Sequence, residues 1–336
     1  MLCLFFAILP PAILAGVRDA SLGRDWFGYG IDIWNLATNA SSIVPVMGQY
    51  PAIEPGYKIL NYLTGLISSD CHVFFFIHQL ILVTIAVAVA YKKREHHHSE
   101  FILLFYFLYM FNTSMTIIRQ SIALMLCLLA YSLWDSQFRK KSYACLGFAV
   151  FFHVSAVFAF FMYVLSKCKN FLQKHQILIL ILVLFVTYNT VNSFTFILTK
   201  LIDLNIFSWH YIGYADQVGD VSIHKTDMAF QFAVLLLAWF LPSKIKNKEV
   251  STQIFFLSLT AISLNMFGNI TDIAFRVAHY FILPIAVLMP RIAKTPKSNR
   301  IACLIFAFLL LVRFLYFAHA DGLENTVPYK SAILGI

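Results

Sequence analysis

The stretch KKSYACLGFAVFFHVSAVFAFFMYVLSKCK, residues 140–169, decides how this chain is folded. Its apolar part, residues 143–165, would be about 35 Å long as one α-helix, which is enough to cross a membrane once. Lysines stand at both ends of the stretch, and one histidine, His153, stands near its middle. A single crossing would put the two ends on opposite sides of the membrane, whereas a break at the histidine would let both ends face the same side.

The composition places the whole chain in a membrane. Of its 336 residues, 60% are hydrophobic and only 12% are charged, whereas soluble domains carry about 25% charged residues. Apolar runs of spanning or near-spanning length recur along the chain. The sequence therefore predicts an all-α, polytopic integral membrane protein.

The net charge of +9 comes mostly from short loops between the apolar runs. These loops are residues 92–100, 135–142, 166–176, 243–250 and 291–300. Together they hold 16 of the 25 Lys and Arg residues but only 4 of the 16 Asp and Glu residues. Positive loops mark the cytoplasmic side of membrane proteins, so we expect all five loops there and no nucleic-acid partner.

The loops determine the rest of the predicted topology. We expect about 9 full spans in one transmembrane domain, residues 1–336, with external segments at about 17–72 and 191–226. Residues 101–134 would be about 51 Å long as one helix. They are therefore predicted to form two short spans, with a turn near the NTSMT sequence at residues 112–116.

The opening stretch is predicted to be a broken re-entrant hairpin. A single crossing would turn three later basic loops, with 10 positive charges, toward the outside, against the positive-inside bias. Two short helices that enter from the cytoplasm, meet near His153 and return avoid this conflict, and counting them as two spans gives 11. Backbone freed at such a break must be buried in protein or line a wet cavity.

The predicted external segment 17–72 combines carboxylates with aromatic rings. Asp25 and Glu54 are candidates for acid–base chemistry, and Tyr29 and Tyr57 for sugar binding. Ring faces pack on the C–H patches of sugars, while carboxylates accept hydrogen bonds from hydroxyls. Pro55 follows Glu54 and would fix a turn beside it. The same composition also fits an interfacial aromatic belt with a solvated loop.

Arg119 opens the apolar run RQSIALMLCLLA, residues 119–130. An arginine at membrane depth is a functional candidate, and at a helix N-terminus it adds its charge to the positive end of the dipole. Its guanidinium matches phosphate oxygens bidentately, and Gln120 can donate or accept a hydrogen bond beside it. The alternative is an arginine that snorkels to the outer headgroups.

Further candidates lie later in the chain. His153 can accept a proton or pair with phosphate when charged, although a lone buried histidine is more often a satisfied polar core group. Arg276 enters a later span from the outside and is a second candidate phosphate clamp, and Tyr280, which follows it in the same span, is a candidate for substrate binding. A lid or substrate groove is expected from the second external segment, at Tyr211, Tyr214 and Asp216.

No metal site and no cofactor are predicted. The three histidines at 96–98 do not share a helical face and lie in a basic loop, and the six cysteines are scattered without metal spacing. The sequence also lacks a Walker loop, a dinucleotide fingerprint and a serine nucleophile elbow.

Six short motifs follow one another along the chain. They are VRDASLGRDWFGY (17–29), EPGYKILN (54–61), RQSIA (119–123), FHVSA (152–156), FRVAHYF (275–281) and VPYKS (327–331). In this order, they resemble the EpsG/Wzy-type family of bacterial polysaccharide polymerases. The resemblance covers most of the chain.

The resemblance implies a membrane glycosyltransferase of the bacterial inner membrane, with an active site that faces the periplasm or exterior. Such a polymerase moves a growing glycan from its polyprenyl diphosphate carrier onto the terminal sugar of the next lipid-linked repeat unit of O-antigen, capsule or exopolysaccharide. Its expected partners are polyprenyl diphosphate-linked glycans, membrane lipids, a chain-length regulator and a flippase. The alternatives are an O-antigen ligase-like transferase and a flippase or carrier of lipid-linked sugars.

The candidate residues can be assigned roles in that reaction. Arg119, Arg276 and His153 are candidates to stabilise the leaving diphosphate without a metal. Glu54, Asp25 or His153 would take the proton of the acceptor hydroxyl. Direct displacement would invert the configuration at the anomeric carbon.

Overall fold

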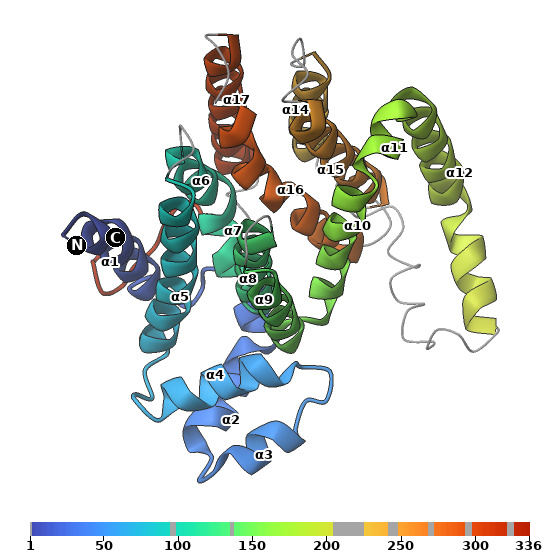
Figure 1. The fold of residues 1–336 in the computed structure, drawn as a ribbon. Helices are drawn as coiled ribbons and strands as arrows, with labels where there is room; N and C mark the ends of the chain where they lie inside the picture. Colours follow the sequence, from blue (N-terminus) through green and yellow to red (C-terminus); the bar gives the residue numbers. More distant parts are fainter. Residues whose placement is uncertain are drawn as a thin grey trace. The chain divides into compact units, whose positions relative to one another are not determined.

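Every regular element of the described chain is a helix (Figure 1). The computed structural model describes residues 2–94, 99–134, 138–203, 225–240, 248–267, 272–292, 298–320 and 326–336. The predicted all-α class is therefore confirmed. The chain divides into two compact units, and the prediction of a single transmembrane domain stays a prediction.

The first unit consists of residues Met1–Val157 and Leu310–Ile336. Its helices are α1 (Leu2–Gly16), the π-helix η1 (Trp26–Gly30), α2 (Ile31–Asn39), α3 (Ile43–Gly48), α4 (Pro55–Gly65), α5 (Cys71–Lys92), α6 (Glu100–Phe105), the π-helix η2 (Tyr106–Met110), α7 (Phe111–Thr116), α8 (Ile118–Trp134) and α9 (Arg139–Phe152). Within it, α5 packs against both α1 and α8, and α8 packs along α9.

The second unit consists of residues Phe158–Leu309, and the 3₁₀-helix η3 (Val154–Phe160) straddles its start. Its helices are α10 (Phe161–Lys167), α11 (Lys169–Lys174), α12 (Gln176–Asp203), α14 (Lys225–Phe240), α15 (Lys248–Phe267), α16 (Asp272–Ile292) and the first part of α17 (Ser298–Ala320). Here α15 packs against α14 and α16. Helix α12 continues beyond residue 190, where the sequence predicts that span to end, because apolar residues recur as far as Leu201.

Two described helices, α5 and α15, are long and apolar enough to cross a membrane. Shorter apolar helices cover Phe5–Gly16, Ile118–Trp134, Val154–Leu165, Gln176–Thr190, Thr226–Phe240 and Cys303–His319. The recurrence of apolar helices agrees with the predicted membrane class. The number of full spans stays a prediction.

The helical path breaks at His153, as the sequence predicts, and directly after the NTSMT sequence, which itself lies in α7. Helix α9 ends at Phe152, and His153 has an extended backbone (φ −158°, ψ 123°) before η3 begins. In residues 101–134, Ile117 (φ −96°, ψ 61°) separates α7 from α8. That both arms of the 140–169 stretch return to one side of the membrane stays a prediction.

The predicted external segment 17–72 is folded into short helices that share an aromatic core with α5 and α8. Its cluster of buried residues is Trp26, Ile33, Trp34, Tyr57, Phe74, Phe75 and Ile118. The Trp26 ring stacks on Phe74 with 5.8 Å between ring centroids, and Tyr57 is fully buried. This core ties the segment to the first turns of α5 and α8, so the segment is a packed cap of the first unit.

Both chain ends belong to this unit and lie close together (Figure 1). The VPYKS motif holds them: the Tyr329 hydroxyl donates to the Leu14 carbonyl, and the Ser331 hydroxyl donates to the Val17 carbonyl. The Asp19 amide also donates to the Lys330 carbonyl over 2.8 Å. The C-terminal segment therefore fastens the start of the external segment to the end of α1.

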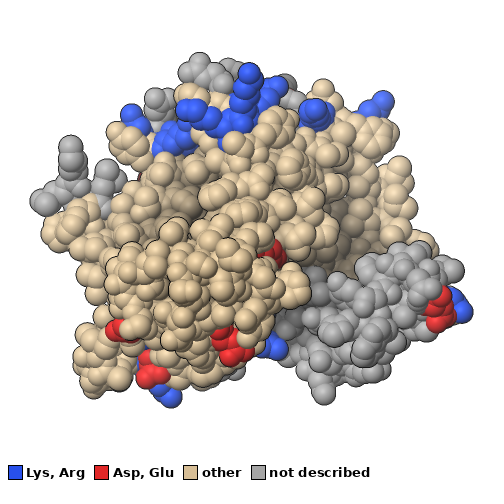
Figure 2. Space-filling view, turned by 90° about the horizontal axis from the view of Figure 1, so that it is seen from below, with Lys and Arg blue, Asp and Glu red and all other residues tan. Residues whose placement is uncertain are grey.

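Two of the basic loops meet in the first unit. The ammonium groups of Lys92 and Lys141 lie 4.6 and 4.9 Å from the centre of the same Phe138 ring. Figure 2 shows lysine and arginine side chains in blue and aspartate and glutamate side chains in red. Loops 92–94 and 138–141 are thus side by side, as expected if they face the same side of the membrane.

Candidate functional site

Arg119 lies in the first turn of α8, as the sequence predicts. Its side chain is only 15% exposed. The His78 Nε2 atom donates to the Ile118 carbonyl in this turn over 3.0 Å, and Arg18 donates to the Met115 carbonyl at the end of the preceding helix, α7, over 3.0 Å. The guanidinium therefore sits at the positive end of a well-anchored helix, where an anion is favoured.

Glu54 forms an ion pair with Arg119 through its Oε2 atom. The side chain of Glu54 is 13% exposed, so both charges are largely removed from water. Pro55 keeps the preceding backbone extended, and Glu54 has φ −65° and ψ 146° at the start of α4. The turn predicted at Pro55 thus aims the carboxylate across to α8.

The second carboxylate oxygen of Glu54 reaches the break in the 140–169 stretch. The Val154 amide donates to Glu54 Oε1 over 3.1 Å. Helix α4 can approach this closely because Gly56 has no side chain: a Cβ there would lie 2.8 Å from the Phe151 carbonyl oxygen. One carboxylate therefore joins α4, α8 and the residue that follows His153.

The broken helix leaves no amide unpaired between residues 153 and 156. The His153 amide donates to Ala149 O and the Ala156 amide to His153 O, each over 3.0 Å. The other two amides have side-chain acceptors. The Val154 amide donates to Glu54 Oε1, and the Ser155 amide donates to His153 Nδ1 over 3.3 Å. Two of the predicted catalytic side chains thus replace the helical carbonyls that the break removes.

His153 also has a defined orientation. The Ser155 hydroxyl lies 2.7 Å from the same Nδ1 atom that accepts the Ser155 amide. A ring nitrogen that accepts a hydrogen bond carries no proton, so neutral His153 has its N–H on Nε2. Ser155, which lies 9% exposed beside it, is a site residue that the sequence did not predict.

Tyr29 and Asp25 complete the cluster around Arg119. The Arg119 guanidinium carbon lies 4.4 Å from the centre of the Tyr29 ring, and the Tyr29 hydroxyl donates to Asp25 Oδ2 over 2.7 Å. Burial, and then the charge of Asp25, raise the pKa of Tyr29, so its hydroxyl stays a donor at neutral pH. The Tyr57 ring meets the Tyr29 ring edge-on at 5.9 Å, within the core.

Six predicted residues remain: Gln120, Arg276, Tyr280, Tyr211, Tyr214 and Asp216. Gln120 is buried in α8, next to Arg119 in the chain. Arg276 is partly exposed and Tyr280 is buried, and both lie on α16 in the second unit. The three residues expected in a lid or groove, Tyr211, Tyr214 and Asp216, lie outside the described residues. Their roles stay predictions.

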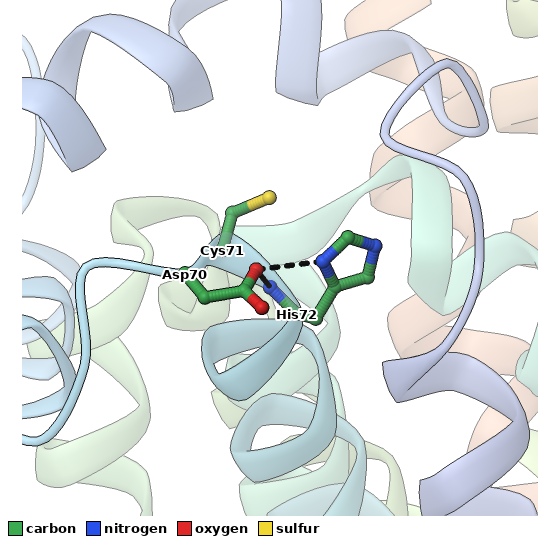
Figure 3. A group of neighbouring side chains, drawn as sticks. All are labelled: Asp70, Cys71 and His72. Atoms are coloured by element: carbon green, nitrogen blue, oxygen red, sulfur yellow. Dashed lines mark hydrogen bonds and ion pairs between the residues drawn. The ribbon is translucent and has the colours of Figure 1, made fainter. Parts of the chain in front are cut away.

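A group with donor atoms of metal-ligand type occurs at the start of α5. The donor atoms of Asp70, Cys71 and His72 lie within 4.8 Å of one another. Figure 3 shows Asp70 facing His72 while the Cys71 sulfur points away. Asp70 Oδ1 accepts the His72 amide over 3.0 Å and lies 2.6 Å from His72 Nδ1, and these two hydrogen bonds lower the pKa of Asp70. The carboxylate is therefore a helix cap, which explains the group without a metal.

Comparison with known proteins assigns the chain to a family. No curated protein and no solved structure matches it. The family described as the EpsG family matches residues 1–331. Because this match covers the cluster around Arg119, the second unit and the C-terminal fastening, the chain belongs to the EpsG family.

Proposed function

We propose that this membrane protein is a polysaccharide polymerase that joins lipid-linked oligosaccharide repeat units at the outer face of the bacterial inner membrane. It would transfer the growing glycan from its polyprenyl diphosphate carrier to the terminal sugar of the next lipid-linked repeat. Membership of the EpsG family supports the polymerase-like role. The observation that carries the proposal is the meeting of Glu54, Arg119 and the Val154 amide, which come from three separate motifs.

Arg119 is the residue best placed to hold the leaving group. A sugar diphosphate gains negative charge as its glycosidic bond breaks, and a fixed guanidinium stabilises this charge most where water is excluded. The Tyr29 ring beneath the guanidinium keeps it in a defined plane. In this role Arg119 exchanges its Glu54 partner for the diphosphate oxygens.

The same exchange would prepare Glu54 for proton transfer. A carboxylate that loses its arginine partner becomes a better proton acceptor. The acceptor hydroxyl oxygen would then attack the anomeric carbon, and its proton would pass to Glu54. The bond between the anomeric carbon and the diphosphate breaks, its electron pair stays on the diphosphate oxygen beside Arg119, and the configuration is inverted.

His153 has a different part in this scheme. Its Nδ1 atom is occupied by Ser155, so Nε2–H is the group that can donate to a diphosphate or hydroxyl oxygen. Asp25 is engaged by the Tyr29 hydroxyl and supports the ring under Arg119. We therefore propose Glu54 as the base and Asp25 as a positioning residue. Arg276 remains a candidate second clamp.

A conservative substitution separates chemistry from folding. Glu54→Gln keeps an oxygen that can accept the Val154 amide, but it removes the charge and the basic site. In cells with equal amounts of each protein, we expect Glu54→Gln and Arg119→Ala to leave single repeat units in place of the polymer ladder. Arg24→Ala removes an exposed positive charge of the same external segment, and this control should keep a normal ladder.

The products also distinguish the alternatives. Loss of a polymerase leaves single repeats attached to the final acceptor, loss of a ligase leaves polymer on the carrier lipid, and loss of a carrier stops both. A full-length ladder from Glu54→Gln at normal protein level would rule out Glu54 as the base. Polymer that accumulates on the carrier would rule out the polymerase itself.

A further inference from the structure

A cavity in the second unit is lined by both basic and apolar residues, which is typical of a site for an amphiphilic ligand. It has a volume of about 530 Å³, within the range of about 300–1,000 Å³ that small-molecule sites occupy. It lies where the junction of α11 and α12 meets the end of α14 and the start of α15, and α15 packs against both α11 and α12. None of the residues assigned to the candidate functional site lines it.

Part of the lining of this cavity is polar and positively charged. Lys174, His175 and Lys248 line it, from the end of α11, the junction with α12 and the first residue of α15. Both lysines are exposed, so their charges are available to a ligand. Glu249, the only acidic residue among described residues 169–181, 236–240 and 248–252, is not among the lining residues. The rim is therefore suited to an anion.

Other lining residues of the cavity are apolar, and the apolar surface continues along α12. Trp239, Ile177 and Ile181 line it, and the Trp239 ring is held at 5.3 Å from the Phe255 ring. Ile177, Ile181 and Phe185 are spaced by four residues, so they share one helix face, and each is at least 60% exposed. This apolar stripe extends about 12 Å from the cavity.

We propose that the cavity binds an anionic phospholipid, with the phosphate at Lys174 and Lys248 and one acyl chain along Ile177 and Ile181. A free phosphate or a soluble anion would leave the apolar lining residues uncovered, whereas a lipid contacts the basic residues with its phosphate and the apolar residues with its acyl chain. Basic pockets at the membrane surface recognise anionic lipid headgroups in this way. This inference does not depend on the proposed polymerase activity.

Tryptophan fluorescence can test the proposal, because Trp239 lies in the wall of the cavity. The full-length protein is placed in phosphatidylcholine vesicles that contain a small fraction of phosphatidylglycerol with brominated acyl chains, which quench nearby tryptophans. The difference between the wild type and Trp239→Phe isolates the signal of this residue. We expect brominated phosphatidylglycerol to quench it more strongly than the same fraction of brominated phosphatidylcholine.

Paired substitutions identify the source of the preference. Lys174→Gln with Lys248→Gln should weaken the preference for phosphatidylglycerol on the order of 30-fold at low salt. Lys200→Gln with Lys330→Gln removes the same charge from exposed positions elsewhere and should leave the preference intact. In the wild type, added salt should reduce the preference, which provides a measurement that needs no variant.

Three outcomes of these measurements would overturn the proposal. They are equal quenching by the two brominated lipids, an equal loss of preference in both pairs of variants, and a preference in the wild type that salt does not change. Unbrominated polyprenyl phosphate can be added in the same assay as a competitor. If it completely relieves the quenching by brominated phosphatidylglycerol at equal concentration, the site belongs to the carrier lipid and the assignment to a phospholipid is wrong.

Discussion

The ion pair between Glu54 and Arg119 predicts a measurable coupling between two residues that are far apart in the sequence. We consider the single variants Glu54→Ala and Arg119→Ala and the double variant. At an effective dielectric constant of about 20, two unit charges roughly 4 Å apart attract each other by about 4 kcal/mol. The side chains are 13% and 15% exposed, so screening by water is incomplete. Desolvation and the ordering of two long side chains oppose this attraction.

We therefore expect a coupling free energy of about 2 kcal/mol. Each single variant should lower the free energy of unfolding by about 3 kcal/mol, because it leaves the other charge largely buried without its partner. The double variant should lose clearly less than the sum of the two. Arg119→Ala also loses the contact with the Tyr29 ring, worth about 1 kcal/mol, so it should be the more destabilising single change.

The coupling can be measured by titrating the purified protein with a denaturing detergent in mixed micelles and following tryptophan fluorescence. A matched cycle is Lys200→Ala with Asp203→Ala, whose ion pair at 3.5 Å is about 60% exposed on each side and should couple weakly. If the Glu54 and Arg119 effects add to within about 0.5 kcal/mol, the pair does not exist in the folded protein. The proposed exchange of partners would then lose its basis.

Two further predictions concern the supports of the site. Gly56→Ala should lower the free energy of unfolding by about 1–2 kcal/mol and shorten the polymer, because its Cβ would meet the Phe151 carbonyl oxygen at 2.8 Å. The control Gly48→Ala, with no atom within 4 Å of its Cβ, should change the free energy of unfolding by less than about 0.5 kcal/mol in the same titration. An equal effect at both glycines would contradict the close approach of α4 to Phe151. Asp70→Ala should cost about 1 kcal/mol at neutral pH through the lost helix cap. Because two hydrogen bonds from His72 lower the pKa of Asp70, this contribution to stability is complete above the ordinary carboxyl pKa of about 4 and is lost as the pH falls through the lowered pKa. If the difference in unfolding free energy between the wild type and Asp70→Ala grows in acid, the assignment of Asp70 as a helix cap is wrong.

The length of the apolar runs and the charges of the loops predicted that the helices break at His153 and near residues 112–116. The 34-residue run from 101 to 134 is too long for one span, and the structure divides it at Ile117. The 140–169 stretch is not too long, so its break had to be inferred from the charges of distant loops, and the structure has it at His153. Length and charge are sums over many residues, which makes them dependable guides even when each residue is ambiguous.

The contacts that make the site were beyond the reach of those patterns. Glu54 and Arg119 are separated by 65 positions, and nothing in either neighbourhood specifies the other as its partner. Tyr29 comes under Arg119 through the π-helix η1 and the aromatic core of the external segment, which are products of tertiary packing. The role of the Val154 amide could not be predicted from the sequence, because every residue except proline has a backbone amide. Composition alone favoured an aromatic belt for segment 17–72, and it could not predict that Trp26, Trp34 and Tyr57 are buried together in a core.

The way in which the break is stabilised links folding to the proposed chemistry. A helix that is interrupted within a membrane must find new acceptors for its freed amides. Here the acceptors are Glu54 and His153, so both side chains are held in place by the backbone that they satisfy. If Arg119 leaves Glu54 for a diphosphate, the Val154 amide still fixes the carboxylate through its other oxygen. The break therefore allows the base to lose its charged partner without losing its position, which a carboxylate held by the arginine alone could not do.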